Sequence, residues 1–494
     1  MSPTIDEITQ QKLDKLAALR SAGIEPYPYG YHRTHTTQQS IELLEKHKDE
    51  LHIREFRVNV AGRVMAKRGM GKTSFMDLRD GSGKIQLFFR INNLGENKYN
   101  SVKEIDIGDI IGGSGKLFLT RTKEPTIEIE DFTLLAKSIQ PLPEKWHGLV
   151  DVEKRYRQRY LDLISNPEVK NTFVLRCKII SGIREYLNRC GFLEVETPVL
   201  QPEAGGASAR PFITHHNALD RDFYLRIALE LHLKRLIIGG FDKVYEIGRI
   251  FRNEGIDFKH NPEFTMLESY EAYADYRDVM KMLEDMISTV CQQIFGTMAV
   301  EFNGHTINFA PPWKRMELRQ AVIQYAGLDY DQFPDTESLK GEMVRRGIQF
   351  DPSKERGKLI DELISTFVDP QMIQPTILYD YPVELSPLAK KKQGDERVVE
   401  RFEAYAGGME IANAFTELND PLDQRQRFLK QMEDRAAGDE EAPKMDEDFL
   451  LAMEHGMPPT GGLGVGIDRL VMLLTNQQSI REVILFPALR EKID

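Results

Sequence analysis

Acidic side chains near the end of the sequence have the types and spacing that binding a cation requires. Segment 400–421 reads ERFEAYAGGMEIANAFTELNDP and interleaves Glu403, Glu410, Asn413 and Glu417 with apolar residues. Carboxylates crowded along a buried strand repel one another unless a cation compensates them, because an uncompensated buried charge costs on the order of several kcal/mol. The pattern predicts a site for Mg²⁺ or for an ammonium group. The alternative is that half of these side chains face solvent.

A second polar group lies in segment 245–273, YEIGRIFRNEGIDFKHNPEFTMLESYEAY. One strand-like run ends at Arg252 and another begins near Phe264, which predicts a hairpin. Alternation along the second run places four side chains on one face, namely Phe264, Met266, Glu268 and Tyr270. A carboxylate and a phenol among apolar companions point to a lined cavity. The alternative is a surface hairpin with satisfied ion pairs.

A third segment, 460–474, reads TGGLGVGIDRLVMLL and predicts a glycine-rich strand that runs into an apolar helix. Glycines let a ligand approach the backbone closely, and Arg469 at the junction offers a planar, permanently charged fork for a phosphate or an aromatic ring. The alternative is a strand-to-helix turn that tolerates glycine without binding anything.

The elements around these segments predict a modular chain. Residues 5–22 read as one helix, and from Phe56 five short β-branched runs separated by glycines predict a small closed barrel. Pro141 and Pro143 then break the pattern. We expect a helical appendage over 1–45, the barrel over 46–143, a helical linker over 144–167, and an α+β domain over 168–494 whose mainly antiparallel sheet is flanked by helices. The acidic stretch 433–448 is expected to be an exposed loop.

Composition narrows the class of protein. The 494 residues carry a net charge of −12, but 54–137 hold fifteen Lys and Arg against eleven Asp and Glu, which permits a local polyanion site. The three cysteines form no Cys-x-x-Cys pair, and no signal peptide or membrane-spanning run is present. We therefore expect a cytoplasmic protein without membrane association. Walker, dinucleotide-binding and His-Glu-x-x-His motifs are also missing from the sequence.

Taken in chain order, 245–273, 400–421 and 460–474, the three segments together with 191–212 (GFLEVETPVLQPEAGGASARPF) resemble the signature motifs of class II aminoacyl-tRNA synthetases. Segment 191–212 resembles motif one, which forms the dimer interface in that family; 245–273 resembles motif two, and 460–474 resembles motif three. An upstream barrel containing RVMAKRGMGKTSFMDLRD narrows the resemblance to the enzymes that charge aspartate, asparagine or lysine. ITHHNALDRDFYLRIALELHLKRL, NAFTELNDP and AYADY resemble the lysine branch of bacterial type.

The resemblance implies a homodimeric ligase that activates L-lysine with ATP and Mg²⁺ and esterifies it onto lysine tRNA. It implies ATP contacts from Arg252, Glu254, His260, Asn261, Phe264, Glu403, Glu410 and Arg469, of which Arg252 and Arg469 would be catalytic and Glu403 and Glu410 would ligate Mg²⁺. It implies a lysine pocket of Gly206, Glu230, Glu268, Tyr270, Asn413, Phe415 and Glu417. The barrel would read the anticodon through Arg68, Phe75, Gln86 and Glu124.

Three alternatives remain at this point: an aspartyl- or asparaginyl-tRNA synthetase, a relative that attaches lysine to a protein, and a nucleic-acid-binding scaffold without activity. The sequence also departs from the family at Lys123 and Pro125, which flank Glu124, and at Met409, where relatives commonly have Arg. Without the resemblance, Phe75 would read as a plain core residue.

Overall fold

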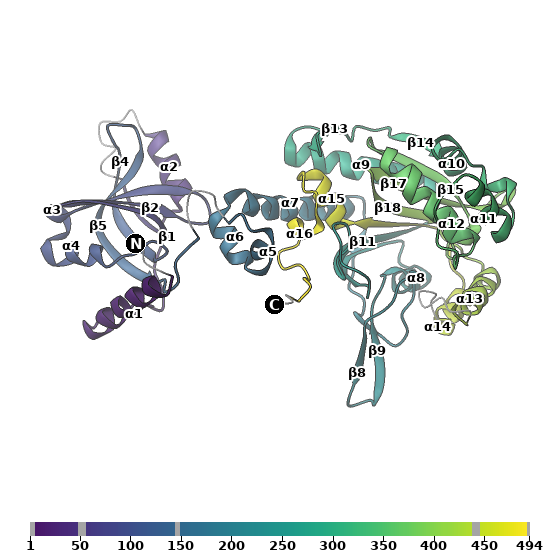
Figure 1. Cartoon of the computed structure of the whole chain (residues 1–494), viewed down its shortest axis with the longest axis horizontal. Coiled ribbons are helices and arrows are strands. Elements are labelled where there is room, and N and C mark those ends of the chain that lie inside the picture. The colour runs from purple at the N-terminus through teal and green to yellow at the C-terminus, as the bar shows by residue number, and fades with distance from the viewer. Residues whose placement is uncertain (1–4, 48–55, 144–148, 437–444, 492–494) are drawn as a thin grey trace. The chain divides into compact units, whose positions relative to one another are not determined.

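The computed structural model describes residues 5–47, 56–143, 149–436 and 445–491. The chain divides into two compact units, Met1–Val150 and Asp151–Asp494 (Figure 1). Each unit has its own hydrophobic core. Among the described residues, no helix combines the length and the apolar character that crossing a bilayer requires.

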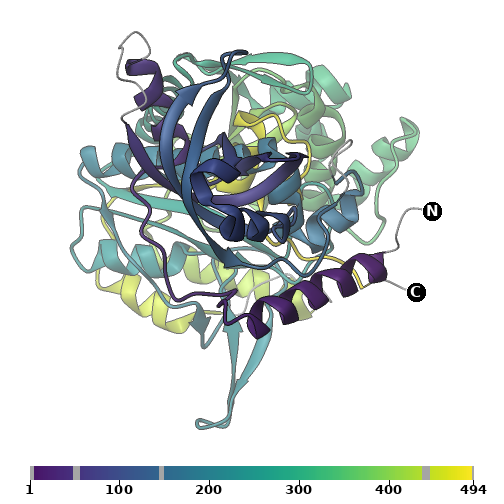
Figure 2. The same cartoon turned by 90° about the vertical axis from the view of Figure 1, so that its left-hand side faces the viewer.

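The first unit is a five-stranded barrel with short helices on its outside. Its strands close in the order β1-β2-β3-β5-β4, and only the β3–β5 pair is parallel. Figure 2 views this unit face-on and shows α1 along the outside of the barrel, where Lys12 Nζ donates to the carbonyl oxygens of Ile107 and Gln140. The elements are α1 (Ile5–Ser21), α2 (Thr37–Lys46), β1 (Arg57–Met70), β2 (Thr73–Arg79), β3 (Lys84–Arg90), α3 (Ile91–Leu94), α4 (Glu96–Lys103), β4 (Ile110–Leu119) and β5 (Pro125–Ala136).

The barrel forms because its strands alternate. In β2 and β3 every second residue is buried, so Met76, Leu78, Ile85, Leu87 and Phe89 fill the interior while their neighbours face outward. The predicted small closed barrel is confirmed.

The second unit is built on a mixed sheet in the order β14-β15-β17-β18-β19-β11-β10-β6, in which the β14–β15 and β10–β6 pairs are parallel and the other pairs are antiparallel. Those strands are β6 (Leu193–Glu194), β10 (Lys243–Phe251), β11 (Glu263–Ala272), β14 (Lys314–Glu317), β15 (Thr376–Pro382), β17 (Asp395–Ala406), β18 (Met409–Thr416) and β19 (Thr460–Gly466). The remaining strands are β7 (Leu200–Gln201), β8 (Ile213–His216), β9 (Arg221–Leu225), β12 (Ala299–Phe302), β13 (His305–Asn308) and β16 (Lys391–Lys392). The predicted α+β class with a mainly antiparallel sheet is confirmed.

Helices cover one face of this sheet and leave part of the other face for a cavity. The main core lies between β10, β11, β17, β18 and β19 and the helices α7 (Pro167–Arg189), α9 (Tyr276–Phe295) and α15 (Ile467–Leu474). On the opposite face, α8 (Glu230–Ile238) packs against β10 and β11. The remaining helices are α5 (Val152–Arg157), α6 (Arg159–Ser165), α10 (Leu318–Ala326), α11 (Thr336–Arg345), α12 (Arg356–Leu363), α13 (Pro421–Ala436), α14 (Glu447–Glu454) and α16 (Ile480–Val483).

Helix α9 illustrates why these helices begin and end where they do. Asp275 caps its first turn by accepting hydrogen bonds from the backbone of Arg277 and Asp278, and Gly296 ends it in the left-handed conformation at φ 71°. Of the acidic stretch predicted to be a loop, 437–444 lies outside the described residues. The loop prediction is wrong at both ends of the stretch, because 433–436 belong to α13 and 447–448 to α14.

Candidate active site and nucleic-acid interface

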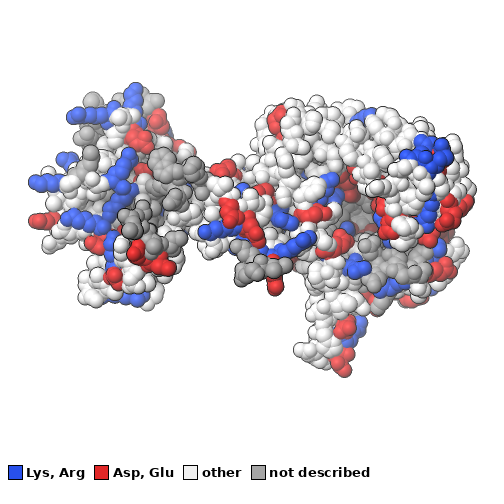
Figure 3. All heavy atoms as spheres, in the orientation of Figure 1, with Lys and Arg blue, Asp and Glu red and all other residues white. Residues whose placement is uncertain are grey.

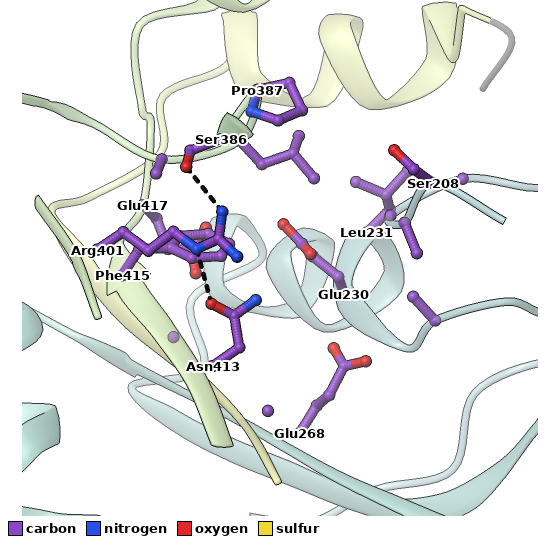
Figure 4. A pocket seen from close by; sticks show the side chains of 18 of the residues that line it. Ser208, Glu230, Leu231, Glu268, Ser386, Pro387, Arg401, Asn413, Phe415 and Glu417 are labelled. Atoms are coloured by element: carbon purple, nitrogen blue, oxygen red, sulfur yellow. Dashed lines mark hydrogen bonds between the residues drawn. The ribbon is translucent and has the colours of Figure 1, made fainter. Parts of the chain in front are cut away.

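A cavity of about 280 Å³ lies in the second unit, on the sheet face opposite α7, α9 and α15. Residues from β11, β18, β19, α8 and the loops around residues 206 and 387 line it, and Figure 4 shows Glu230, Glu268 and Asn413 directed into a common hollow. All seven residues that the resemblance implied for lysine line this one cavity: Gly206, Glu230, Glu268, Tyr270, Asn413, Phe415 and Glu417. Arg252 lines it as well.

Strand alternation positions the cavity residues on β11. Met266, Glu268 and Tyr270 face the cavity, whereas Leu267 between them belongs to the core under the helices. The face predicted from the sequence is therefore the face that lines the hollow.

Glycines on β19 make room for these side chains. A Cβ added at Gly462 would lie 1.8 Å from Glu417 Oε1 and 2.8 Å from Tyr270 Cε1. At Gly464 the added carbon would lie 3.1 Å from the flexible end of Met266. Gly206 adopts φ +86°, a conformation that other residues rarely adopt. The cavity wall along β19 is thus backbone, and a side chain at Gly462 would overlap Glu417.

Glu268 is buried and held by two donors. Its Oε1 accepts from the backbone N–H of Leu229 at 2.9 Å, and its Oε2 accepts from the Tyr270 hydroxyl at 3.0 Å. Burial, and then the neighbouring Glu230 carboxylate, raise the pKa of Glu268 to about 7. An ammonium group in the cavity would stabilise the ionised form of this carboxyl.

Glu417 is fully buried at the other side of the cavity, where Lys234 contacts it. Lys234 Nζ forms an ion pair with Glu417 Oε2 and lies 2.5 Å from Glu230 Oε1. Within the described chain, neither carboxylate oxygen of Glu417 accepts a hydrogen bond, and Oε2 has only the ion pair with Lys234. Burial alone lowers the pKa of Lys234, but the carboxylates of Glu230 and Glu417 outweigh burial and raise it. The two carboxylates therefore favour the ammonium form of Lys234, while burial raises the pKa of Glu417 against the opposing effect of Lys234. Glu417 Oε1 is a buried acceptor without a donor in the described chain.

Several of the residues implied for ATP contact one another. The Arg252 guanidinium lies 5.3 Å from the ring centre of Phe264, and its Nε donates to the carbonyl oxygen of Ile227 at 3.3 Å. Glu254 is exposed in the loop that follows.

Arg469 connects two further residues of the same group. Its Nη1 lies 3.1 Å from Glu410 Oε2, and its Nη2 lies 3.3 Å from His260 Nε2. The other ring nitrogen of His260, Nδ1, contacts Asp257 Oδ2 at 2.8 Å. These side chains are half-buried or exposed, so a ligand can replace their mutual contacts.

Asn261 uses both ends of its amide within the protein. Nδ2 donates to the carbonyl oxygen of Glu263 at 2.6 Å, and Oδ1 accepts from the backbone N–H of Ala488 at 3.2 Å. Its side chain holds the loop of the hairpin against the C-terminal segment.

Arg401, which the sequence interpretation missed, links the cavity to Glu403. Its Nε donates to Asn413 Oδ1 at 2.9 Å and Nη1 donates to Ser386 Oγ at 2.9 Å (Figure 4). Its Nη2 contacts Glu403. Its guanidinium also stacks 4.6 Å from the ring centre of Tyr381. Register explains the arrangement, because Arg401 and Glu403 on β17 pair with Phe415 and Asn413 on β18.

Glu403 and Glu410 have the chemistry of a magnesium site that a nucleotide completes. Among the described residues, no three acidic, His or Cys side chains come close enough to enclose an ion by themselves. Mg²⁺ is commonly held by one or two carboxylates together with substrate phosphates and water. Nearby Asp369 has a buried Oδ1 without a hydrogen-bond partner, and burial, followed by Glu403 and Glu410, raises its pKa to about 7. The negative potential and the hard oxygen donors fit Mg²⁺.

The outer face of the barrel carries the residues implied for nucleic acid. Phe75 is half-exposed there and lies outside the buried core, so its interpretation as a plain core residue is wrong. Register places Arg68 opposite Phe75 on neighbouring strands, and Asp77 opposite Gln86. Lys and Arg side chains gather on the visible face of this unit in Figure 3.

Further contacts define this outer face. Gln86 Oε1 accepts from Thr126 Oγ1 at 3.2 Å, and Glu124 lies exposed directly after Lys123, whose φ is +60°. Phe88, absent from the sequence interpretation, stacks on Phe75 with ring centres 4.5 Å apart and planes 19° apart. Its position two residues after Gln86 on β3 was the signal that could have identified it.

Comparisons with known proteins agree with this geometry. Residues 151–490 match the family described as tRNA synthetases class II (D, K and N), and residues 58–135 match the OB-fold nucleic acid binding domain. The lysine–tRNA ligase of Dehalococcoides mccartyi is 60% identical over 489 residues, which cover 99% of this chain and 98% of that protein. The lysine–tRNA ligases of Moorella thermoacetica and Bacillus cytotoxicus are 55% and 50% identical, over 99% of this chain and 98% and 99% of their own lengths.

Both units of the chain are therefore covered by matching families, and its relatives align over nearly their whole length. The chain belongs to the lysine–tRNA ligase family of class II tRNA synthetases.

Proposed function

We propose that the cavity binds L-lysine, that the chain activates this lysine with ATP and Mg²⁺, and that it then transfers the lysyl group to lysine tRNA. The observation that carries the proposal is the buried Oε1 of Glu417, an acceptor in the cavity wall without a donor in the described chain. A buried carboxylate oxygen of this kind requires a cationic or hydrogen-bonding ligand.

The charges that line the cavity favour one orientation of lysine. Its ε-ammonium would meet Glu417 and the Tyr270 hydroxyl, and its α-ammonium would meet Glu230, Glu268 and the backbone at Gly206. Asn413 and Phe415 line the wall beside the aliphatic stem. The α-carboxylate would then point toward Arg252, the cationic residue at the rim that also borders the nucleotide residues.

Activation joins two anions, and Arg252 offsets their repulsion. An oxygen of the lysine carboxylate forms a bond to the α-phosphorus of ATP, and the bond from that phosphorus to the bridging oxygen breaks, releasing pyrophosphate. A guanidinium fixed between carboxylate and phosphate stabilises the developing charge. The carboxylate is already ionised, so no general base is needed for this step.

ATP would be held by the half-buried groups that now contact one another. Phe264 would stack under the adenine and Arg469 would cover its other face and reach the γ-phosphate, while His260, Glu254 and the loop held by Asn261 would surround the phosphates. Glu403 and Glu410 would hold Mg²⁺. When bound, the ion neutralises phosphate charge and so favours departure of pyrophosphate.

Transfer to tRNA completes the reaction. A terminal ribose hydroxyl of the tRNA forms an ester with the lysyl carbonyl carbon as AMP leaves. The barrel would bind the anticodon, with Phe75 stacking on an unpaired base, Gln86 and Arg68 contacting its polar edge, and Glu124 contacting the first anticodon base.

Homodimer formation through 191–212 and a cytoplasmic location belong to the same proposal. The exposed apolar side chains in and beside that segment, Leu193, Val199, Leu200 and Ile213, support an interface there. Light scattering on the purified chain should give twice the monomer mass.

Lysine-dependent exchange of pyrophosphate into ATP tests the function directly. Purified protein should exchange label with lysine and give no signal above background with aspartate or asparagine. The three buried carboxylates argue against an acidic or neutral substrate, because a cavity for aspartate needs cations. Exchange that depends on aspartate or asparagine instead would overturn the proposal. Transfer of lysine to a protein and not to tRNA would identify the chain as the relative that attaches lysine to a protein. The nucleic-acid-binding barrel disfavours this alternative.

A further inference from the structure

The wall of the cavity contains a lysine that belongs to the protein. Lys234 on α8 has no exposed surface, and its Nζ lies 5.4 Å from the ring centre of Phe415 and 6.0 Å from that of Phe449. It contacts one oxygen of Glu230 and one oxygen of Glu417. Lys234 does not itself line the cavity, whereas both of its carboxylate partners do.

Neither oxygen of Glu417 accepts a hydrogen bond within the described residues, but the ion pair with Lys234 forms through Oε2. Oε2 contacts Lys234, and Oε1 lies where a Cβ on Gly462, a residue of the cavity wall, would come within 1.8 Å. A guanidinium is a planar fork that binds a carboxylate best through both oxygens at once. An ammonium is a compact point charge, and a single oxygen is sufficient to receive it.

We propose that Lys234 is a specificity-determining residue, which occupies Glu417 Oε2 so that the cavity accepts an ammonium and rejects a guanidinium. The inference rests on the proposed function, in which Glu417 receives the substrate's ε-ammonium. Lys234 acts through Glu417 and does not touch the substrate, so it is a positioning residue. Its ion pair prevents the carboxylate from turning both oxygens toward arginine, the amino acid most similar to lysine in charge and length.

Lys234→Met tests the inference, because methionine keeps much of the buried stem and removes the ammonium. The measurement is kcat/KM for lysine divided by kcat/KM for arginine in ATP–pyrophosphate exchange. We expect this ratio to fall at least tenfold, because Glu417 becomes free to accept both arms of a guanidinium. If the role of Lys234 is purely structural, the substitution lowers kcat/KM for lysine and for arginine together and leaves the ratio unchanged.

Lys243→Met is the matched control. Lys243 also forms an ion pair with a glutamate, 2.6 Å from Glu271 Oε1, but it is partly exposed and does not line the cavity. The lysine-to-arginine ratio of kcat/KM in Lys243→Met should equal that of the wild type. An unchanged or increased ratio in Lys234→Met overturns the inference.

A second pair of variants covers the case in which Lys234→Met does not fold. Lys234→Met combined with Glu230→Gln removes one positive and one negative charge, so the net charge of the buried cluster stays constant. It is compared with Glu230→Gln alone, and the lysine-to-arginine ratio should again be at least tenfold lower in the double variant. Equal ratios overturn the inference here too.

The wild type separates this inference from the proposed function. If the wild type shows no lysine-dependent exchange, the proposed function fails. If the wild type prefers lysine and the variants keep its ratio, only the role of Lys234 fails.

Discussion

The amino-acid half and the nucleotide half of the site are prepared in different ways. In the amino-acid half, Glu268 already accepts hydrogen bonds from Leu229 and Tyr270, and Glu417 is fully buried against Lys234. In the nucleotide half, Arg469 contacts Glu410 and His260, and these groups remain partly exposed. The carboxylates of the amino-acid half already have buried partners, whereas Arg469 and its partners must exchange their mutual contacts for those of a ligand.

The difference follows from what each half must achieve. Lysine must be distinguished from other amino acids, and discrimination is strongest where buried polar groups are fixed and a wrong ligand leaves them unpaired. A nucleotide with its metal ion carries several charges, and these can replace exposed ion pairs that contribute at most about 1 kcal/mol each. Substitutions in the amino-acid half should therefore raise the KM for lysine, and substitutions in the nucleotide half should raise the KM for ATP.

Glu417→Gln should have the largest effect. It removes the charge that receives the ε-ammonium, so the KM for lysine should rise about a hundredfold or more while the KM for ATP changes less than threefold. Steady-state exchange kinetics with each substrate varied in turn provide the measurement. A lysine KM equal to that of the wild type would remove Glu417 from the lysine pocket.

Gly462→Ala should give the next largest effect. The added Cβ would lie 1.8 Å from Glu417 Oε1, so the carboxylate must move and the lysine KM should rise about fiftyfold. Gly464→Ala is the graded control, because the nearest atom to its Cβ is the flexible end of Met266 at 3.1 Å, and the next atoms lie at ordinary contact distances of 3.7 and 3.9 Å. Equal effects of the two variants would contradict the preformed cavity.

Arg469→Gln probes the other half. Loss of the guanidinium should raise the KM for ATP about thirtyfold and leave the KM for lysine within about threefold. The melting temperature should change little, because the pair with Glu410 is partly exposed. Arg425→Gln removes an exposed ion pair in which Arg425 Nη1 lies 3.0 Å from Glu447 Oε2, and it should leave both KM values unchanged. A rise confined to the KM for lysine would contradict the division of the site into an amino-acid half and a nucleotide half.

The affinity for lysine should be about tenfold higher at pH 8 than at pH 6. Burial, followed by Glu230, raises the pKa of Glu268 to about 7, and the α-ammonium requires the ionised form. Affinity for lysine therefore increases as pH rises through 7, and the KM increases below it. Glu268→Gln should have a high lysine KM with this dependence removed. The same slope in the variant would assign the titration to another group.

Phe75→Ala should have the smallest effect and act outside both halves. Loss of one stacking surface should raise the KM for tRNA about five- to tenfold. Exchange without tRNA should be unchanged, since the active-site residues all lie in the second unit. A parallel loss of exchange would mean that the substitution had damaged the fold.

Residues on a single regular strand were accessible from the sequence. Alternation placed Phe264, Met266, Glu268 and Tyr270 on one face without knowledge of the fold. The last three line the cavity, and Phe264 contacts Arg252 instead. The same rule predicted the barrel from its short alternating strands. Local periodicity is sufficient where one element supplies several groups to a site.

Contacts between distant segments were not accessible in this way. Lys234 lies in a run that reads as an ordinary amphipathic helix, and only the fold brings it to Glu417, 183 positions later. Arg401 likewise reads as one charge among several, yet it joins Asn413 to Glu403. Asn261, which the resemblance implied as an ATP contact, uses its amide on Glu263 and Ala488, and no pattern in the sequence indicated either partner. Tertiary pairing decides the partner of a charged or amide side chain, and no local pattern encodes it.

The bare backbone of β19 has a consequence for redesign of the substrate range. Gly462 and Gly464 have no side-chain atoms to remove, so this wall cannot be cut back to admit a bulkier amino acid. Directed evolution toward larger substrates must enlarge the cavity through substitutions in β18, in α8 or in the loop at Ser386 and Pro387. Libraries randomised at the two glycines should yield mostly inactive clones.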